Sequence, residues 1–93
     1  MDESGSNGYF HHSLGVVLYQ LERYDDAVRE FRRALSKEPS MATARYHLGA
    51  SYMKLGDAAK AMDEYEAALA IDPNHEFAQA KVDLLTNQAM SPN

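Results

Sequence analysis

Apolar side chains along this chain recur at intervals of three and four residues, which is the spacing of one face of an α-helix. The second half shows the pattern most clearly, at Leu48, Tyr52, Leu55, Ala61, Tyr65, Ala68 and Leu69. An alternation of apolar and polar residues, which would indicate a strand, never persists. The pattern therefore predicts an all-α protein with helices at about residues 7–20, 24–37, 41–55, 58–71 and 75–89.

Residues that stop and start helices lie between these segments. Pro39 and Pro73 follow the second and fourth helices, where proline cannot continue the helical hydrogen bonding. Gly56 provides the turn between the third and fourth helices. The expected N-caps of the third, fourth and fifth helices are Ser40, Asp57 and Asn74.

The chain also repeats itself with a period of 34 residues, and residues 8–41 align on 42–75 without a gap. The identical pairs are Leu14 and Leu48, Gly15 and Gly49, Leu21 and Leu55, Ala27 and Ala61, Glu30 and Glu64, Ala34 and Ala68, Leu35 and Leu69, and Pro39 and Pro73. Each unit contains two predicted helices joined by a turn of two or three residues, so the two helices must pack antiparallel. A period of this length indicates units that stack on their neighbours.

The repeated glycines, Gly15 and Gly49, lie inside the first predicted helix of each unit. Glycine costs a helix about 1 kcal/mol relative to alanine, so another interaction must offset that cost. Small residues on the second helices, Ala27 and Ala61, would let the two backbones approach closely. We expect the aromatic ring one turn further along, Phe31 or Tyr65 (aligned in the repeat), to fill the space beside them.

In these features the chain resembles the tetratricopeptide-repeat family, whose signature is W-x2-L-G-x2-Y, then A-x3-F, then P. The matching residues are His11, Leu14, Gly15, Leu18, Ala27, Phe31 and Pro39, and then Arg45, Leu48, Gly49, Tyr52, Ala61, Tyr65 and Pro73. His11 and Arg45 stand at the tryptophan position and Glu22 at the turn glycine, departures that are expected to weaken packing. The resemblance implies a right-handed α-solenoid with repeats at 8–41 and 42–75, a capping helix at 76–89, a flexible segment at 1–7 and a tail at 90–93.

The resemblance further implies a binding function, because the first helices of successive repeats line a concave groove that holds a peptide or helix of a partner protein. The positions that map to this groove include Tyr9, His12, Val16, Tyr19, Tyr46, His47, Met53, Lys54, Phe77, Lys81 and Leu84. Exposed aromatic and methionine side chains suit a binding surface. In the alternative interpretation, Tyr9, Tyr19 and Tyr46 pack on one another.

One subfamily binds the acidic C-terminal tails of chaperones through lysine, asparagine and arginine side chains. Here Val16 and Ala50 stand where the asparagines of that clamp are expected, and positive charge comes only from Lys54 and Lys81. This sequence therefore argues against a chaperone-tail clamp.

The two ends of the expected array differ in polarity. On the last helix the outward positions are Gln79, Asp83 and Thr86, which suit a terminal cap. The first helix instead carries an apolar stripe of Phe10, Leu14, Val17 and Leu21. Either the chain comes from a longer array, or this stripe meets a partner or a second copy, which makes homodimerisation the alternative function.

No arrangement of residues indicates catalysis, a cofactor or a metal site, and the chain is expected not to be an enzyme. His11 and His12 are adjacent and point apart on a helix, while His12 and His47 could approach each other without a third ligand. The sequence suggests one helical ion pair, between Asp25 and Arg29. The basic residues Arg29, Arg32, Arg33 and Lys37 are interpreted as a solvated face, offset by Asp25, Asp26 and Glu30, and the alternative is a docking patch for an acidic partner or nucleic acid.

Composition narrows the class of protein further. The formal net charge of −5 disfavours binding to nucleic acid, and the absence of cysteine excludes disulfides and cysteine-ligated zinc. No apolar run is long enough to span a membrane, and Met1 to Gly8 lacks the features of a signal peptide. A cytoplasmic location without membrane insertion is therefore expected.

Overall fold

The computed structural model describes the backbone of residues 7–90 and the side chains of residues 7–87. Within this range it contains five helices, α1 (Gly8–Gln20), α2 (Tyr24–Lys37), α3 (Ala42–Lys54), α4 (Ala58–Ile71) and α5 (Glu76–Met90). The prediction of an all-α fold with five helices is confirmed, and no helix end differs from its expected position by more than one residue. The flexible segment expected at 1–7 lies outside the described residues except for Asn7, as does the expected tail at 90–93 except for Met90.

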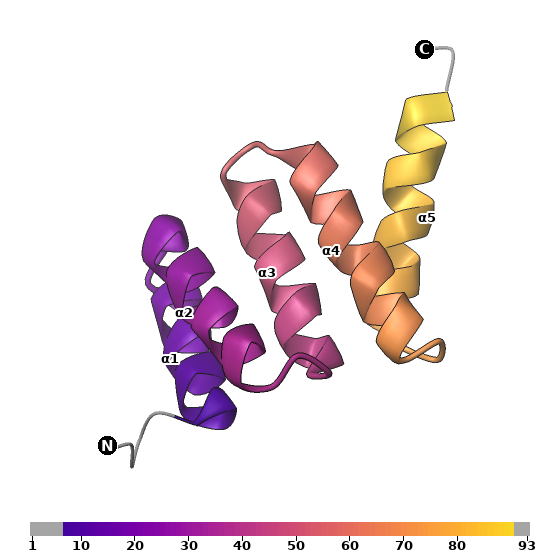
Figure 1. Cartoon of the computed structure of the whole chain (residues 1–93). Coiled ribbons are helices and arrows are strands. Elements are labelled where there is room, and N and C mark those ends of the chain that lie inside the picture. Colours follow the sequence, from indigo (N-terminus) through magenta and orange to yellow (C-terminus); the bar gives the residue numbers. More distant parts are fainter. Residues whose placement is uncertain (1–6, 91–93) are drawn as a thin grey trace.

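The helices follow one another along an elongated molecule with extents of 53 × 27 × 16 Å (Figure 1). The main contacts are made by helices that are neighbours in sequence: α1 with α2, α2 with α3, α3 with α4, and α4 with α5. Figure 1 shows α1 and α5 at opposite ends of the row. This arrangement is a solenoid, in which each helical pair packs only on the next.

Small side chains and two rings dominate the core. Phe31 of α2 and Tyr65 of α4 are fully buried, as are Ala27, Ala34, Ala44, Ala61 and Ala68. The two rings occupy equivalent positions of the two repeats. The expectation that Leu55 belongs to the buried face of the third helix is wrong, because this residue caps the C-terminal end of α3, where its side chain is exposed.

The repeated glycines make room for these two rings. A Cβ atom at Gly49 would lie 2.8 Å from Cε1 of Tyr65 and 3.2 Å from the backbone oxygen of Ala61. A Cβ atom at Gly15 would lie 2.6 Å from Cε1 of Phe31. The predicted close approach to the small residue is therefore confirmed at Gly49, and at both glycines the nearest neighbour is the aromatic ring.

The tryptophan positions of the two repeats carry polar residues that find equivalent partners. In the first repeat, Nδ1 of His11 lies 2.8 Å from Oε1 of Glu30. In the second, Nη1 of Arg45 donates to Oε1 of Glu64 over 3.1 Å. A carboxylate on the second helix of each unit thus holds the side chain that replaces tryptophan, so that a polar bond joins the two helices at this position.

The N-terminal caps partly differ from expectation. Asp57 caps α4 as predicted, since Oδ1 accepts from the backbone N–H of Lys60 over 3.0 Å. The predictions of Ser40 and Asn74 as N-caps are wrong. For Ser40, the reason is that α3 begins after Met41 and its first turn has no side-chain cap. At α5, Nδ1 of His75 accepts from the backbone N–H of Ala78 over 3.1 Å. Asn74 does not cap α5 because the Asp72 carboxylate accepts from its backbone N–H, which keeps Asn74 in the preceding turn.

The turns inside the two repeats have the same left-handed residue. Gly56 has a φ of 85°, and the aligned residue Glu22 has a φ of 63°. For a residue with a side chain, this conformation costs about 1–2 kcal/mol. Glu22→Gly is therefore expected to raise the free energy of unfolding by about 1 kcal/mol, measured by urea denaturation. Gly56→Ala provides the opposite control with a loss of similar size, and an unchanged stability of Glu22→Gly would contradict the explanation.

Candidate functional site

The face built from α1, α3 and α5 has two hollows. The first, of about 310 Å³, lies between the C-terminal halves of α1 and α3 and the middle of α5. Its lining comprises Tyr19, Ala50, Met53, Lys54, Tyr65, Lys81, Leu84 and Leu85. Five residues that the sequence assigns to the groove are therefore brought together here: Tyr19, Met53, Lys54, Lys81 and Leu84.

The second hollow, of about 450 Å³, lies nearer the start of α3 and α5 and is lined by Thr43, Tyr46, His47, His75 and Phe77. The centre of the Tyr46 ring lies 5.3 Å from that of His75, 5.6 Å from that of Tyr65 and 6.1 Å from that of Phe77. This arrangement places three more predicted groove residues, Tyr46, His47 and Phe77, around one aromatic hollow.

The remaining groove predictions have different positions. Tyr9 is 68% exposed on the first turn of α1 and lines neither hollow. Val16 is half-buried and packs against the core, while His12 contacts His47. Packing of the Tyr9, Tyr19 and Tyr46 rings on one another is not observed. The Tyr19 ring packs edge-on against Tyr24, and the Tyr46 ring packs against His75 in the second hollow.

Three residues of these hollows were missed by sequence reasoning. Tyr65 was assigned only to the core, although one side of its ring borders the first hollow. His75 comes from the start of the last helical segment and Leu85 from its middle, and this segment packs on α4. A signal for His75 was available, because it is an aromatic residue two positions before Phe77 at the start of a groove-lining helix.

Two histidines form the polar floor beside the second hollow. Nε2 of His12 lies 2.9 Å from Nδ1 of His47, so the predicted approach of these side chains is confirmed. The His47 ring stacks on Phe31, with centroids 5.6 Å apart and an interplanar angle of 19°. Burial lowers the pKa of His47 to about 4, with smaller contributions from His12 and His75, and burial also lowers the pKa of His12. Both rings are therefore neutral at pH 7, and one donates its single N–H to the other.

Charged groups outside this face are largely paired. On α2, Arg29 pairs with Asp26, which also accepts from Arg23, so the expected pair of Arg29 with Asp25 is wrong. Both carboxylates lie about one turn before Arg29, and spacing alone therefore could not choose between them. Arg33 pairs with Glu30 over 2.7 Å. These pairs support the interpretation of the α2 arginines as a largely neutralised, solvated face, with Arg32 as an exception that is described below.

The apolar stripe of α1 lies on the outer edge of the solenoid. Phe10, Leu14, Val17 and Leu21 have exposed fractions of 49, 36, 50 and 62%. At the other end of the molecule, Nε2 of Gln79 donates to Oδ1 of Asp83 over 2.9 Å on an exposed surface. The difference in polarity between the two ends is therefore present in the folded chain.

Within residues 7–87, no cluster of three or more histidine, aspartate or glutamate side chains has the geometry to hold a metal ion. None of the five helices described is both long enough and apolar enough to cross a membrane.

Comparison with known proteins agrees with this architecture. A model of the tetratricopeptide repeat matches residues 12–76, which is most of the chain. The chain belongs to the tetratricopeptide-repeat family. The crystal structure of MamA superposes with a TM-score of 0.83 at 25% identity, covering 85% of this chain and 46% of that one. This match confirms the solenoid fold.

The curated relatives are longer proteins. The Hsp70-Hsp90 organizing protein of Triticum aestivum is 33% identical over 81% of this chain and 13% of its own length. The uncharacterized protein ycf37 of Guillardia theta is 28% identical over 95% of this chain and 49% of its own length. The chloroplastic tetratricopeptide-repeat protein PYG7 of Arabidopsis thaliana is 28% identical over 84% of this chain and 26% of its length. The chain thus spans half or less of each, and a cytoplasmic location stays a prediction.

Proposed function

We propose that the chain is a protein-interaction module that holds an extended peptide or a helix of a partner protein on the face formed by α1, α3 and α5. The observation that carries the proposal is the convergence of side chains from all three helices on one hollow, with Tyr19 from α1, Met53 from α3 and Leu84 from α5. Apolar side chains that line a hollow at a surface are the usual anchor points of protein interfaces. Such a role needs no catalytic group and no cofactor.

The polar groups around the hollows indicate which ligand would fit. Lys54 and Lys81 border the first hollow, so an apolar side chain next to an acidic group suits this position. The relative from Triticum aestivum is by name an organizing protein of Hsp70 and Hsp90. In this chain, however, Val16 and Ala50 occupy the clamp asparagine positions, so we do not propose that it binds the acidic tails of chaperones.

The test is a binding measurement with a partner identified by co-purification from the source cell. Tyr46→Ala combined with Met53→Ala removes one anchor from each hollow and is expected to weaken binding at least tenfold by calorimetry. Thr86→Ala, on the opposite side of α5 from the groove positions, serves as the control and should bind like the wild type. Equal affinities of the double variant and the wild type, with both folded by circular dichroism, would exclude this face as the binding site.

A second candidate function is self-association through the apolar stripe of α1, and the exposure of its four side chains favours it. In the second repeat, the equivalent positions Ala44, Leu48 and Ser51 are buried where α3 packs on α2. Among the described residues, no helix covers the stripe in the first repeat. Its members would form an apolar patch of a few hundred Å², which is near the size that marks an interaction site.

We accordingly expect the isolated chain to form a two-fold dimer with the α1 helices in contact. Sedimentation over a range of concentrations should show the mass of a dimer, and Phe10→Ser with Val17→Ser should restore the monomer. Groove binding and self-association are separable, because Tyr46→Ala with Met53→Ala should leave the oligomeric state unchanged. A wild-type monomer at high micromolar concentration, with mass and stability unaltered in the double serine variant, would refute the dimer.

A further inference from the structure

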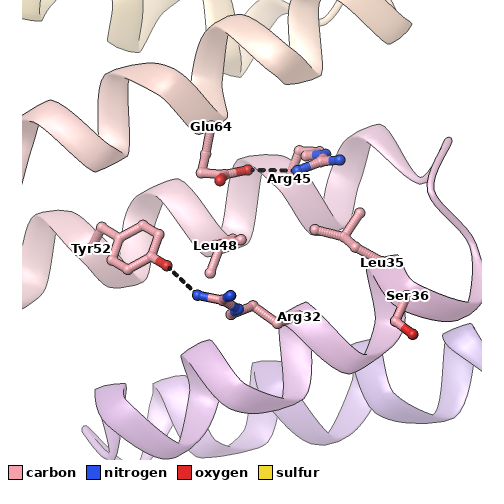
Figure 2. A pocket seen from close by; sticks show the side chains of 7 residues that line it. All are labelled: Arg32, Leu35, Ser36, Arg45, Leu48, Tyr52 and Glu64. Carbon is pink, nitrogen blue, oxygen red and sulfur yellow. Dashed lines mark hydrogen bonds and ion pairs between the residues drawn. The ribbon is translucent and has the colours of Figure 1, made fainter.

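A third hollow lies between α2, α3 and α4, and Figure 2 shows the side chains that line it. It has a volume of about 300 Å³, and its lining comprises Arg32, Leu35, Ser36, Arg45, Leu48, Tyr52 and Glu64. Leu35 and Leu48 are buried and form its base, so that the accessible groups are mainly polar. None of these residues belongs to the groove proposed above.

The charges in this hollow do not balance. Arg45 donates through Nη1 to Glu64, and its Nε is buried without a hydrogen-bond partner among the described residues. Among the described residues, the one hydrogen-bond partner of the Arg32 side chain is the hydroxyl of Tyr52, at the long distance of 3.4 Å. The two side chains are joined by a dashed line in Figure 2. Within the described part of the chain, all the other arginines pair with a carboxylate. The lining of the hollow therefore contains two guanidinium groups and one carboxylate, which leaves one unit of positive charge.

This pair of arginines is not a general feature of the repeat. The residues 34 positions after Arg32 and Arg45 are Glu66 and Gln79, so the next junction between repeats has no cation pair. In contrast, the carboxylates Glu30 and Glu64, which join the helices within each unit, do recur. A group that the packing of every repeat requires would recur, so the extra cation at the junction of α2 and α3 calls for a different explanation.

We propose that this hollow binds an acidic side chain of a partner protein, with Arg32 as the main contact. A guanidinium group presents paired N–H donors that match the two oxygens of a carboxylate. Tyr52 accepts from Arg32 and so retains its own O–H to donate, and the Ser36 hydroxyl offers a further donor. A single carboxylate neutralises the surplus charge, whereas a phosphate dianion would leave an excess of negative charge beside Glu64. The hollow would then be a second docking point, independent of the groove.

The experiment uses a fluorescein-labelled hexapeptide with two adjacent glutamates and its analogue with two glutamines. Fluorescence anisotropy with the full chain at low ionic strength should show binding of the acidic peptide and not of the neutral one. Arg32→Gln should weaken binding about tenfold, which is typical of losing a charge-assisted contact. The matched control is Arg29→Gln, which removes the same charge from the same helix at a side chain that is ion-paired with Asp26.

A second readout locates the peptide. In NMR titrations, the Nε–Hε signals of Arg32 and Arg45 should shift, and that of Arg29 should not. Tyr46→Ala with Met53→Ala should leave the affinity of the acidic peptide unchanged, which separates failure of this proposal from failure of the groove proposal. Equal loss of binding in Arg32→Gln and Arg29→Gln, or tighter binding of a phosphoserine peptide than of the glutamate peptide, would overturn the proposal.

Discussion

Replacement of Gly49 by leucine is expected to lower the free energy of unfolding by about 3 kcal/mol, because overpacking of a filled core usually costs 1–3 kcal/mol and occasionally more. Even the first carbon of a side chain would lie 2.8 Å from the Tyr65 ring and 3.2 Å from the Ala61 backbone oxygen. The ring is fully buried, so it cannot move into solvent, and the backbone of α4 would have to move instead. Urea denaturation followed by circular dichroism measures the loss.

Two further variants make this result specific. Gly49→Ala gains about 1 kcal/mol of helix propensity, which offsets part of its smaller clash, so its loss should lie well below that of leucine. Thr43→Leu places the same side chain at an exposed position of the same helix and should change stability little. A Gly49→Leu variant as stable as the wild type would show that α3 and α4 do not need this close approach.

The fold could be predicted from the sequence because several independent patterns agree on it. Helical spacing of apolar residues located the helices, and the recurrence of Gly15 at Gly49 indicated that two equal units pack in the same way. The helix starts at Ser40 and Asn74 were misplaced because side-chain preference was considered without the preceding turn. In that turn, the Asp72 carboxylate holds the backbone N–H of Asn74 and so delays α5 by one residue.

The candidate site was predictable only in part. Position within a repeat determines which side of a helix faces the groove, so Met53 and Leu84 could be assigned to the same face from their register. Register does not describe how far successive helices are rotated and displaced, and therefore Tyr9 was included although it lies beyond both hollows. The same limit explains why Leu85 was missed, since it reaches the first hollow from the side of α5 that packs toward the core.

The third hollow shows a different limit of sequence reasoning. The arginines of α2 were compared only with the acidic residues of the same helix, which account for Arg29 and Arg33. The partner that distinguishes Arg32 comes from α3, twenty residues further along the chain, where Tyr52 contacts its guanidinium group. Comparison within one helix therefore predicted that Arg29 and Arg33 are offset by acidic residues of α2, although it named the wrong partner for Arg29. It could not identify Arg32 as the arginine that faces a hollow between repeats.

Acidification from pH 7.5 to pH 5 is expected to destabilise the domain by about 1 kcal/mol through His47. Burial is the main cause that lowers the pKa of this group to about 4 in the folded chain, from 6.5 in the unfolded chain. Below pH 6.5 the unfolded chain therefore binds a proton that the folded chain does not, so stability falls as the pH decreases toward 4. The expected loss of stability is smaller than the full pKa shift would give, because the His47 side chain is only partly buried.

The variant His47→Phe tests whether this ring is the origin of the acid sensitivity. Phenylalanine preserves the stacking on Phe31 but carries no titratable group, although it removes the contact with His12. Its stability at pH 7.5 will differ from that of the wild type, so the relevant quantity is the change in unfolding free energy between pH 7.5 and pH 5 for each protein. That change should be smaller by about 1 kcal/mol in the variant. The acid sensitivity that remains comes from His12, because burial lowers its pKa and its effect on stability therefore has the same sign. An equal change in both proteins would place the acid sensitivity elsewhere and would mean that His47 gains its proton in the folded chain as readily as in the unfolded one.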